Sequence, residues 1–289
     1  MLKRKSQSAI IAAIFLILIL ALAACIGSKE PEPITVPEGA QAGDLVGLEP
    51  CTYKANKVEY AADCGTLVVP ENRSDPNSRL IALPVIRVRA TSGSSSEPLF
   101  WFNGGPNSNV TYSPEVAQLN GLIDERDVVM VGYRGVDGSV VLECPEILGA
   151  FKSSESMLSD PVLDNIKESV AQCAGRLQAE GVDLDGYNIM EIIDDMEAAR
   201  VALGYERINL LSQSFGSRVA MIYAWRYPDS LYRVVMYAAL PPGRGAFREP
   251  EKVDEQIEYY AALCAQDAGC STRTDDLAET MRNVAHNMP

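Results

Sequence analysis

The pattern of apolar and polar positions predicts alternating strands and helices after residue 48. Short runs rich in β-branched and apolar residues are typical of strands, and apolar residues at three- to four-residue spacing are typical of helices. We predict strands at Gly65–Pro70, Arg79–Ala90, Pro98–Asn103, Asp127–Tyr133, Arg207–Leu211 and Val234–Leu240. We predict helices at Ser113–Glu125, Asn165–Glu180, Tyr187–Leu203, Phe215–Arg226, Pro250–Gln266 and Thr274–Asn287.

This alternation predicts an α/β fold with a mostly parallel sheet and helices on both faces. The continuous apolar run from Val128 to Val131 is typical of a strand that is buried on both faces. A turn around Asp75 to Ser78 joins the first two strands, which we expect to form an antiparallel edge. The chain has 289 residues, of which 47% are hydrophobic, so it is long enough to bury the core of one such domain.

The first 24 residues predict a secretory leader. A basic start, Lys3 to Lys5, precedes an unbroken apolar run from Ala9 to Ala24. This run is shorter than the ~20 residues that span a bilayer, which favours a signal peptide over a permanent transmembrane helix. The run ends in Leu22-Ala23-Ala24-Cys25, which resembles the lipobox of bacterial lipoproteins. The resemblance implies cleavage before Cys25 and lipidation of its thiol; an ordinary signal peptide with an incidental cysteine is the alternative.

Composition divides the remaining chain into three parts. Residues 25–48 are polar and carry Pro31, Pro33 and Pro37, so we expect a semi-extended tether. Residues 49–245 form the α/β core, and residues 246–289 carry only helical patterns. The formal net charge of −14 repels phosphates, so we expect no nucleic-acid partner. The sequence has no nucleotide-binding glycine fingerprint, and we expect no cofactor.

The seven cysteines agree with export. Lipidation of Cys25 leaves six, which allow 15 disulfide pairings in an oxidising compartment. Proximity in the sequence favours three of these pairs, Cys51–Cys64, Cys144–Cys173 and Cys264–Cys270. A metal site is the alternative, which we disfavour because zinc sites show tighter cysteine pairs or histidine ligands, and His286 is the single histidine.

A candidate nucleophile lies between a predicted strand and a predicted helix. The segment Ser212-Gln213-Ser214-Phe215-Gly216 fits the pattern G-x-S-x-G with serine in place of the first glycine. Such a strand-to-helix turn lifts the serine hydroxyl above the sheet. The N–H of Phe215 at the helix start is a candidate for one half of an oxyanion hole. A serine-rich loop without catalytic meaning is the alternative.

Two further loops follow predicted strands. Phe102-Asn103-Gly104-Gly105-Pro106-Asn107 is glycine-rich, and its backbone N–H groups can point into a cleft; we take Gly105 as the second oxyanion donor. The other loop is Gly132-Tyr133-Arg134-Gly135-Val136-Asp137-Gly138-Ser139. A plain glycine turn is the alternative for the first of them.

These three motifs, in this order, resemble the α/β-hydrolases of the prolyl and tripeptidyl aminopeptidase group. That group shows H-G-G-P-G, then D-x-R-G-x-G-x-S, then G-x-S-x-G, and the resemblance also covers the helix from Asp195 to Gly204. It implies an α/β-hydrolase fold, Ser214 as nucleophile, Gly105 and Phe215 as oxyanion donors, and residues 246–289 as the start of a helical cap. This chain departs from the patterns at Asn103, Asn107, Gly132 and Asp137.

The acid and the histidine of the triad follow later strands in this fold. After Ser214 we predict one more strand, so the sequence resembles a C-terminally truncated member. We reject His286 as the base because no strand precedes it, and we interpret Asp275 and Asp276 as charges at a helix start.

The sequence thus predicts an extracytoplasmic serine hydrolase anchored to the cell membrane through lipid at Cys25. The family resemblance implies an aminopeptidase that acts on peptides through an acyl-enzyme at Ser214, inactive without the Asp and His. An esterase or lipase that acts on small esters, and a non-catalytic lipoprotein that binds a ligand, are the alternatives.

Overall fold

The computed structural model describes residues 34–55, 57–93, 96–105, 107–110, 120–150, 159–242 and 250–287. The predicted signal peptide, the lipidation site Cys25 and the first part of the predicted tether lie outside the described residues. The chain divides into two compact units, residues 1–237 and residues 238–289, and each is described by itself. Within the described ranges, no helix combines the length and the apolar character needed to cross a bilayer.

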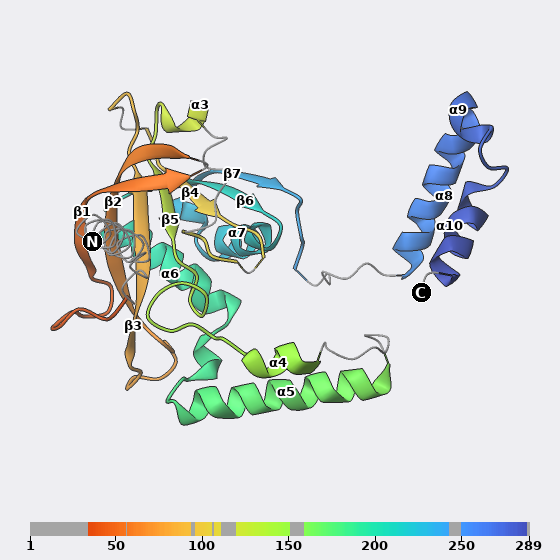
Figure 1. Ribbon diagram of the computed structural model, residues 1–289. Coiled ribbons are helices and arrows are strands. Elements are labelled where there is room, and N and C mark those ends of the chain that lie inside the picture. The colour runs from red at the N-terminus through yellow and green to blue at the C-terminus, as the bar shows by residue number, and fades with distance from the viewer. Residues whose placement is uncertain are drawn as a thin grey trace, which may run out of the picture. The chain divides into compact units, whose positions relative to one another are not determined.

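One mixed seven-stranded sheet forms the centre of the first unit (Figure 1). Its strands are β1 (Leu45–Ala55), β2 (Val58–Pro70), β3 (Leu80–Val88), β4 (Leu99–Phe102), β5 (Val128–Val131), β6 (Ile208–Gln213) and β7 (Leu231–Tyr237). Their order is β1-β2-β3-β5-β4-β6-β7. The pairs from β1 to β5 are antiparallel and the pairs from β5 to β7 are parallel, so five of the seven strands run in one direction. The predicted α/β fold with a mostly parallel sheet is confirmed.

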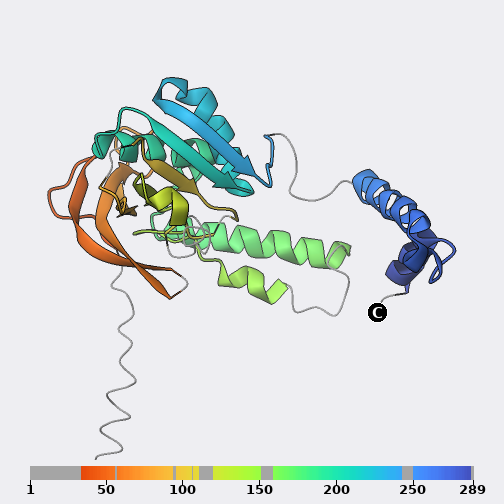
Figure 2. The ribbon, with the colours of Figure 1, turned by 90° about the horizontal axis from the view of Figure 1, so that it is seen from above.

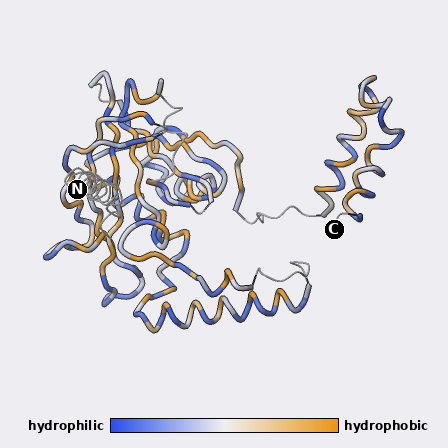
Figure 3. Tube along the Cα trace, viewed as in Figure 1, coloured by the Kyte–Doolittle hydropathy of each residue, from blue (hydrophilic) through white to orange (hydrophobic). Residues whose placement is uncertain are grey.

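Helices cover both faces of this sheet. The first unit contains α3 (Asn120–Ile123), α4 (Pro145–Ala150), α5 (Asp160–Ala179), η1 (Leu184–Gly186), α6 (Ile189–Ala202), α7 (Phe215–Arg226) and η2 (Pro228–Ser230). Helices α6 and α7 bury Ile193, Met196 and Tyr223 against one face, in a core that includes Phe102. Ile123 of α3 belongs to the smaller core on the other face. The apolar residues therefore gather in the sheet, whereas α5 alternates between apolar and polar residues along its length (Figure 3).

The edge strand β1 was not predicted, and its start corrects the predicted tether. Residues 45–48, assigned to the tether, already belong to β1, and Leu45 and Val46 pair with β2. The pattern was hidden because the strand carries Gly47 at φ 64° and Pro50, and its register against β2 shifts between Val46 and Glu49. Proline and such irregularities are tolerated at sheet edges because one side of an edge strand needs no ladder partner.

Other boundaries differ from the predictions by a few residues. Helix α5 begins at Asp160 rather than Asn165, with proline in its first turn, and the last strand covers Leu231–Tyr237 rather than Val234–Leu240. Of the predicted helix Ser113–Glu125, the described part is helical over Asn120–Ile123, and residues 111–119 lie outside the described ranges. Helix α4 was not predicted.

All three predicted disulfides are present. Cys51–Cys64 joins β1 to β2, and Cys144–Cys173 joins the start of α4 to α5. Helices α4 and α5 lie side by side as a hairpin (Figure 2). Cys264–Cys270 lies in the second unit, which contains α8 (Pro250–Gln266), α9 (Ala268–Ser271) and α10 (Leu277–His286). In this unit Arg282 of α10 pairs with Asp254 and Glu258 of α8.

The strand order reverses its direction of progress at the central strands, which makes their carboxyl ends the expected place for a ligand site. The chain passes from β4 to β5 on one side and then crosses to β6 on the other side of β4. Connections that diverge in this way leave a gap above the sheet, which is where ligands bind in open α/β sheets. The loops after β4, β5 and β6 meet at this edge, and they are the three loops that carry the sequence motifs.

Candidate active site

The candidate nucleophile Ser214 occupies a sharp turn between β6 and α7. Its backbone has φ 50° and ψ −117°, a conformation that costs a non-glycine residue on the order of 1–3 kcal/mol. The Ser214 N–H donates to the carbonyl of Tyr237 over 3.2 Å, and its carbonyl accepts from the N–H of Ser217 over 3.0 Å. The strained strand-to-helix turn predicted from the motif is therefore present.

The residues two before and two after Ser214 explain how this turn packs. A Cβ atom at Gly216 would lie 2.1 Å from the carbonyl oxygen of Phe102, so a side chain there is excluded and α7 lies directly against the end of β4. Ser212 stands where the motif has its first glycine, and it is fully buried. Its hydroxyl donates to the carbonyl of Val235 over 3.3 Å, so the added oxygen has a partner and the turn accommodates serine.

The glycine turn after β4 lies against Ser214. A Cβ atom at Gly104 would lie 3.1 Å from the Cβ atom of Ser214, so glycine permits the close approach of the two loops. The N–H of Gly104 donates to Oδ1 of Asn103 over 2.8 Å and is engaged within the turn. Gly105 adopts φ 121°, a value that favours glycine. Gly105 therefore stays our candidate for one oxyanion donor, with Phe215 for the other.

Asp137 joins the glycine turn to the loop after β5. One carboxylate oxygen accepts from the hydroxyl of Ser108 over 2.6 Å. The other accepts from the N–H groups of Asn109 and Tyr133, both over 2.9 Å. The side chain is buried, and its negative charge is stabilised by three hydrogen-bond donors rather than by a cation.

Asn109 and Tyr133 complete this set of contacts. The amide nitrogen of Asn109 donates to the carbonyls of Trp101 and Val131, over 3.0 and 2.8 Å, and its oxygen accepts from the N–H of Asn103. The Tyr133 hydroxyl donates to the carbonyl of Asn103 over 3.1 Å. Burial raises the pKa of Tyr133 far above its usual range, so the hydroxyl keeps its proton. We call these residues the glycine-turn network: Asn103, Ser108, Asn109, Tyr133 and Asp137.

Arg134, in the same loop, belongs to a different cluster. Its guanidinium has no exposed surface and donates two hydrogen bonds of 2.7 Å to Asp195 of α6. It also donates to the carbonyls of Glu71 and Gly186. Arg134 therefore ties the end of β2 and the start of α6 to the loop after β5. Its guanidinium is engaged by these structural partners, and we assign it no part in the chemistry of Ser214.

Three arginines and three carboxylates make up this cluster. Arg73 pairs with both Glu191 and Asp195, and Arg79 pairs with Glu71. The three carboxylate side chains are less than 10% exposed. We call the cluster the arginine–carboxylate network: Glu71, Arg73, Arg79, Arg134, Glu191 and Asp195. This network gives a structural role to Arg134 and Asp195, two residues of the sequence motifs.

The remaining candidates lie in the second unit. The Asp276 carboxylate accepts from the N–H of Glu279 over 2.9 Å at the start of α10, in agreement with its interpretation as a helix-start charge. Asp275 lines a pocket of this unit together with Glu258. His286 is exposed at the end of α10.

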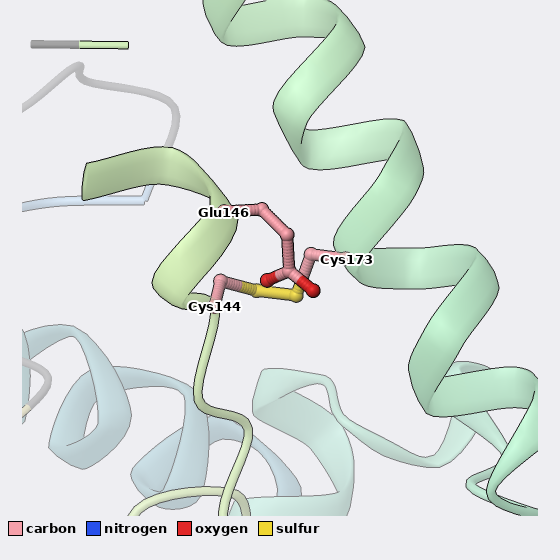
Figure 4. Close-up of side chains that lie close together, drawn as sticks. All are labelled: Cys144, Glu146 and Cys173. Atoms are coloured by element: carbon pink, nitrogen blue, oxygen red, sulfur yellow. A yellow bond between two sulfur atoms is a disulfide. The ribbon is translucent and has the colours of Figure 1, made fainter. Parts of the chain in front are cut away.

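Among the described residues, Cys144, Glu146 and Cys173 have donor atoms within 4.8 Å of one another, as a metal site would require. Figure 4 shows the two sulfur atoms joined in a disulfide beside the Glu146 carboxylate. Metals bind the thiolate, which a disulfide does not offer. Glu146 is engaged by Arg176 over 2.7 Å. This group therefore carries a structural cross-link.

Sequence reasoning noticed Asp137 as a departure from the family pattern but assigned it no role, and it missed Ser108 and Asn109. The signal was the coincidence of two departures: a glycine, Gly132, stands where the family has an acid, and an acid stands where the family has a glycine. A Cβ atom at Gly132 would lie 2.6 Å from the Cβ atom of Asp137, so the two exchanges fit each other.

Comparison with known proteins gives matches over the region that contains the three motif loops. A family model described as alpha/beta hydrolase fold matches residues 97–283. The chain is 28% identical over 252 residues to the serine protease Hip1 of Mycobacterium tuberculosis, covering 81% of this chain and 48% of that protein. It is 24% identical over 241 residues to the tripeptidyl aminopeptidase of Streptomyces lividans, covering 78% of this chain and 44% of that protein.

Among solved structures, an esterase from Thermogutta terrifontis matches with a TM-score of 0.38 and 17% identity, over 68% of this chain and 52% of that one. The chain spans about half the length of the curated relatives it matches.

Proposed function

Because the chain belongs to the α/β-hydrolase fold family, we propose that it is a serine hydrolase of the peptidase type, with Ser214 as the nucleophile. The observation that carries the proposal is the backbone of Ser214, held at φ 50° against Gly104. A structural loop gains nothing from this strain, whereas a nucleophile elbow requires it.

In the proposed reaction, Ser214 Oγ attacks the carbonyl carbon of the scissile bond. A bond forms between Oγ and this carbon, the hydroxyl proton passes to a base, and the carbonyl oxygen becomes an oxyanion. The N–H groups of Gly105 and Phe215 stabilise the oxyanion, and the N-terminus of α7 adds a favourable dipole. The C–N bond then breaks and the amine leaves with the proton that the base had taken. Water attacks the acyl carbon, the bond to Oγ breaks, and the acid product leaves while Ser214 regains its proton.

We propose peptides as substrates, with release of residues from the N-terminus. The names of the two relatives, a serine protease and a tripeptidyl aminopeptidase, support this substrate class. We further propose that residues 246–289 belong to a cap. We assign no histidine base to Ser214, because no strand pattern precedes the single histidine, His286, and we therefore expect slow reaction. A nucleophilic serine without its base retains only the contribution of the oxyanion hole and of substrate binding.

We also propose export and a lipid anchor at Cys25. The leader pattern supports it, as do three disulfides, which form in oxidising compartments. Metabolic labelling with an alkyne fatty acid is expected to mark the wild-type chain and to leave Cys25→Ala unmarked. Equal labelling of both chains would contradict the anchor.

A fluorophosphonate probe tests the nucleophile, because it forms a covalent bond to a serine hydroxyl that lies beside an oxyanion hole. We expect slow labelling of the wild-type chain, none of Ser214→Ala, and unchanged labelling of Ser271→Ala in the second unit. Labelling that persists in Ser214→Ala would refute the assignment. A wild-type chain that stays unlabelled while a control serine peptidase reacts fully would favour a non-catalytic role.

A further inference from the structure

A pocket of about 470 Å³ opens beside the residue that follows Ser214. Phe215 forms one wall, and the loop after β5 and the start of α6 form the others. The apolar side chains that line it are Val136, Leu142, Tyr187, Ile189, Ile192 and Phe215. Pockets of this size accommodate a small ligand or a large side chain of a longer one.

The position of this pocket connects it to the proposed chemistry. Phe215 supplies the N–H that we assign to the oxyanion, and its ring packs edge-on against Tyr133 with 6.0 Å between ring centroids. Phe215 thus belongs both to the proposed oxyanion site, through its N–H, and to the lining of the pocket. The pocket also lies at the edge formed by the carboxyl ends of the strands, because its lining includes Val136, in the loop after β5, and Phe215, the first residue of α7.

The polar side chains that line the pocket are already engaged in hydrogen bonds with other parts of the protein. The Arg134 guanidinium is paired with Asp195. The Tyr187 hydroxyl donates to Glu71 over 2.6 Å. The side-chain amide oxygen (Oδ1) of Asn188 accepts from the N–H groups of Met190 and Glu191 at the start of α6. A charged or strongly polar ligand would lose water here without gaining these partners, so the pocket favours apolar groups.

Leu142 has a particular place in this wall. A Cβ atom at Gly135, which adopts φ 77°, would lie 3.0 Å from both Leu142 and Tyr187, so these side chains close over a glycine. The N–H of Leu142 donates to the carbonyl of Gly135 over 2.9 Å. The disulfide at Cys144 attaches the same segment to α5. The wall is therefore fixed from both ends, which favours selection by shape.

We propose that this pocket binds a bulky apolar side chain, aromatic or branched aliphatic, of the substrate next to the scissile bond. The proposal rests on the proposed function for its meaning and names the substrate class more closely. It makes Leu142 and Ile189 specificity-determining residues, in contact with the substrate side chain and without a part in bond making.

Binding in the absence of chemistry tests the pocket. The full chain with Ser214→Ala is titrated with N-acetyl-L-phenylalaninamide and with N-acetylglycinamide, and binding is followed by NMR of the protein. We expect the dissociation constant of the phenylalanine compound to be at least about tenfold lower, as burial of an aromatic side chain predicts. We expect its chemical shift changes to map to residues around Phe215 and Leu142.

Substitutions in the wall locate the site. Leu142→Trp is expected to fill the pocket and abolish the preference, and Leu142→Ala is expected to weaken phenylalaninamide binding severalfold. Leu148→Trp is the matched control, because Leu148 is 68% exposed on α4, outside the pocket walls. It is expected to keep the wild-type preference. Leu142→Ala provides the measurement if the tryptophan variant does not fold.

Two results would overturn the proposal: equal binding of the two amides, or a preference that both Leu142 variants retain. Failure of the proposed function is a different result, namely absence of fluorophosphonate labelling at Ser214. The amide titration is independent of that outcome because it uses a chain without the nucleophile.

Discussion

The two polar networks that meet in the loop after β5 differ in how they balance buried charge. The arginine–carboxylate network holds three cations and three anions, most of them buried. The glycine-turn network holds one carboxylate, Asp137, and balances it with hydroxyl and backbone N–H donors. The first attaches a helix to the sheet, and the second sets the position of the turn that faces Ser214. Neighbouring residues of one sequence motif therefore serve stability and site geometry separately.

Arg134→Ala is expected to have the largest effect. It leaves Asp195 with Arg73 as its remaining partner in a buried site, and loss of one partner from a buried pair costs about 3–5 kcal/mol of unfolding free energy. Urea unfolding measures this loss. The folded fraction is expected to label at Ser214 at the wild-type rate, because the glycine turn is untouched.

Arg226→Ala is the control for this change. Arg226 pairs with Asp194, also on α6, but its side chain is largely at the surface. Exposed pairs contribute little, so its midpoint should stay near that of the wild type. If both variants unfold at the same urea concentration, the network has no special role in stability.

Asp137→Ala is expected to show the opposite balance, with a smaller loss of stability and a larger loss of reactivity at Ser214. Loss of the carboxylate leaves the N–H groups of Asn109 and Tyr133 without their acceptor and costs about 2 kcal/mol. The larger consequence is a displaced Gly105 and slower fluorophosphonate labelling of folded protein. Asp137→Asn keeps one acceptor oxygen and is expected to restore much of the rate. A wild-type labelling rate in Asp137→Ala would remove the distinction between the networks.

Low pH is expected to weaken the arginine–carboxylate network, because it protonates the Glu71 carboxylate. Burial raises the pKa of Glu71, but hydrogen bonds from Arg79 and Tyr187 outweigh it and hold the pKa below its ordinary value of 4.5. A lowered pKa in the folded state contributes stability above that ordinary value, and the contribution is lost as the pH falls through the folded pKa. Urea midpoints between pH 6 and pH 3 should therefore fall less steeply in Glu71→Gln. Parallel curves for the two proteins would contradict this.

The smallest expected effect concerns Ser214 itself. Glycine adopts positive φ without strain, so Ser214→Gly should be about 1 kcal/mol more stable than Ser214→Ala, which keeps a Cβ atom. Thermal unfolding of the two variants gives the difference. Equal stability would mean that the turn is not strained in solution.

The sequence predicted the parts that local pattern determines. The buried runs of β5 and β6, and the helices α6 and α7, follow from apolar periodicity, and the elbow follows from its place between them. The edge strand β1 escaped because Gly47 and Pro50 interrupt its pattern. Edge strands have one unpaired side, and they tolerate such residues.

The glycine-turn network could not be predicted because its contacts join separate loops. Asn109 bonds to Val131 across 22 positions, and Ser108 bonds to Asp137 across 29. No periodicity records such contacts; the three loops meet only once the strand order places β4 between β5 and β6. The same holds for the pocket wall, where Leu142, in the loop after β5, and Ile189, at the start of α6, line one pocket.

The last strand of the described sheet, β7, has a practical consequence for every measurement above. Among the described residues, Val235 and Met236 are each more than a third exposed, on a strand at the edge of the sheet that pairs with β6. Edge strands that carry exposed apolar side chains are a template for adding strands from other molecules. Protein concentration therefore becomes a variable in its own right, and dilute samples, or a lysine at Val235, are the conditions under which unfolding midpoints report on single molecules.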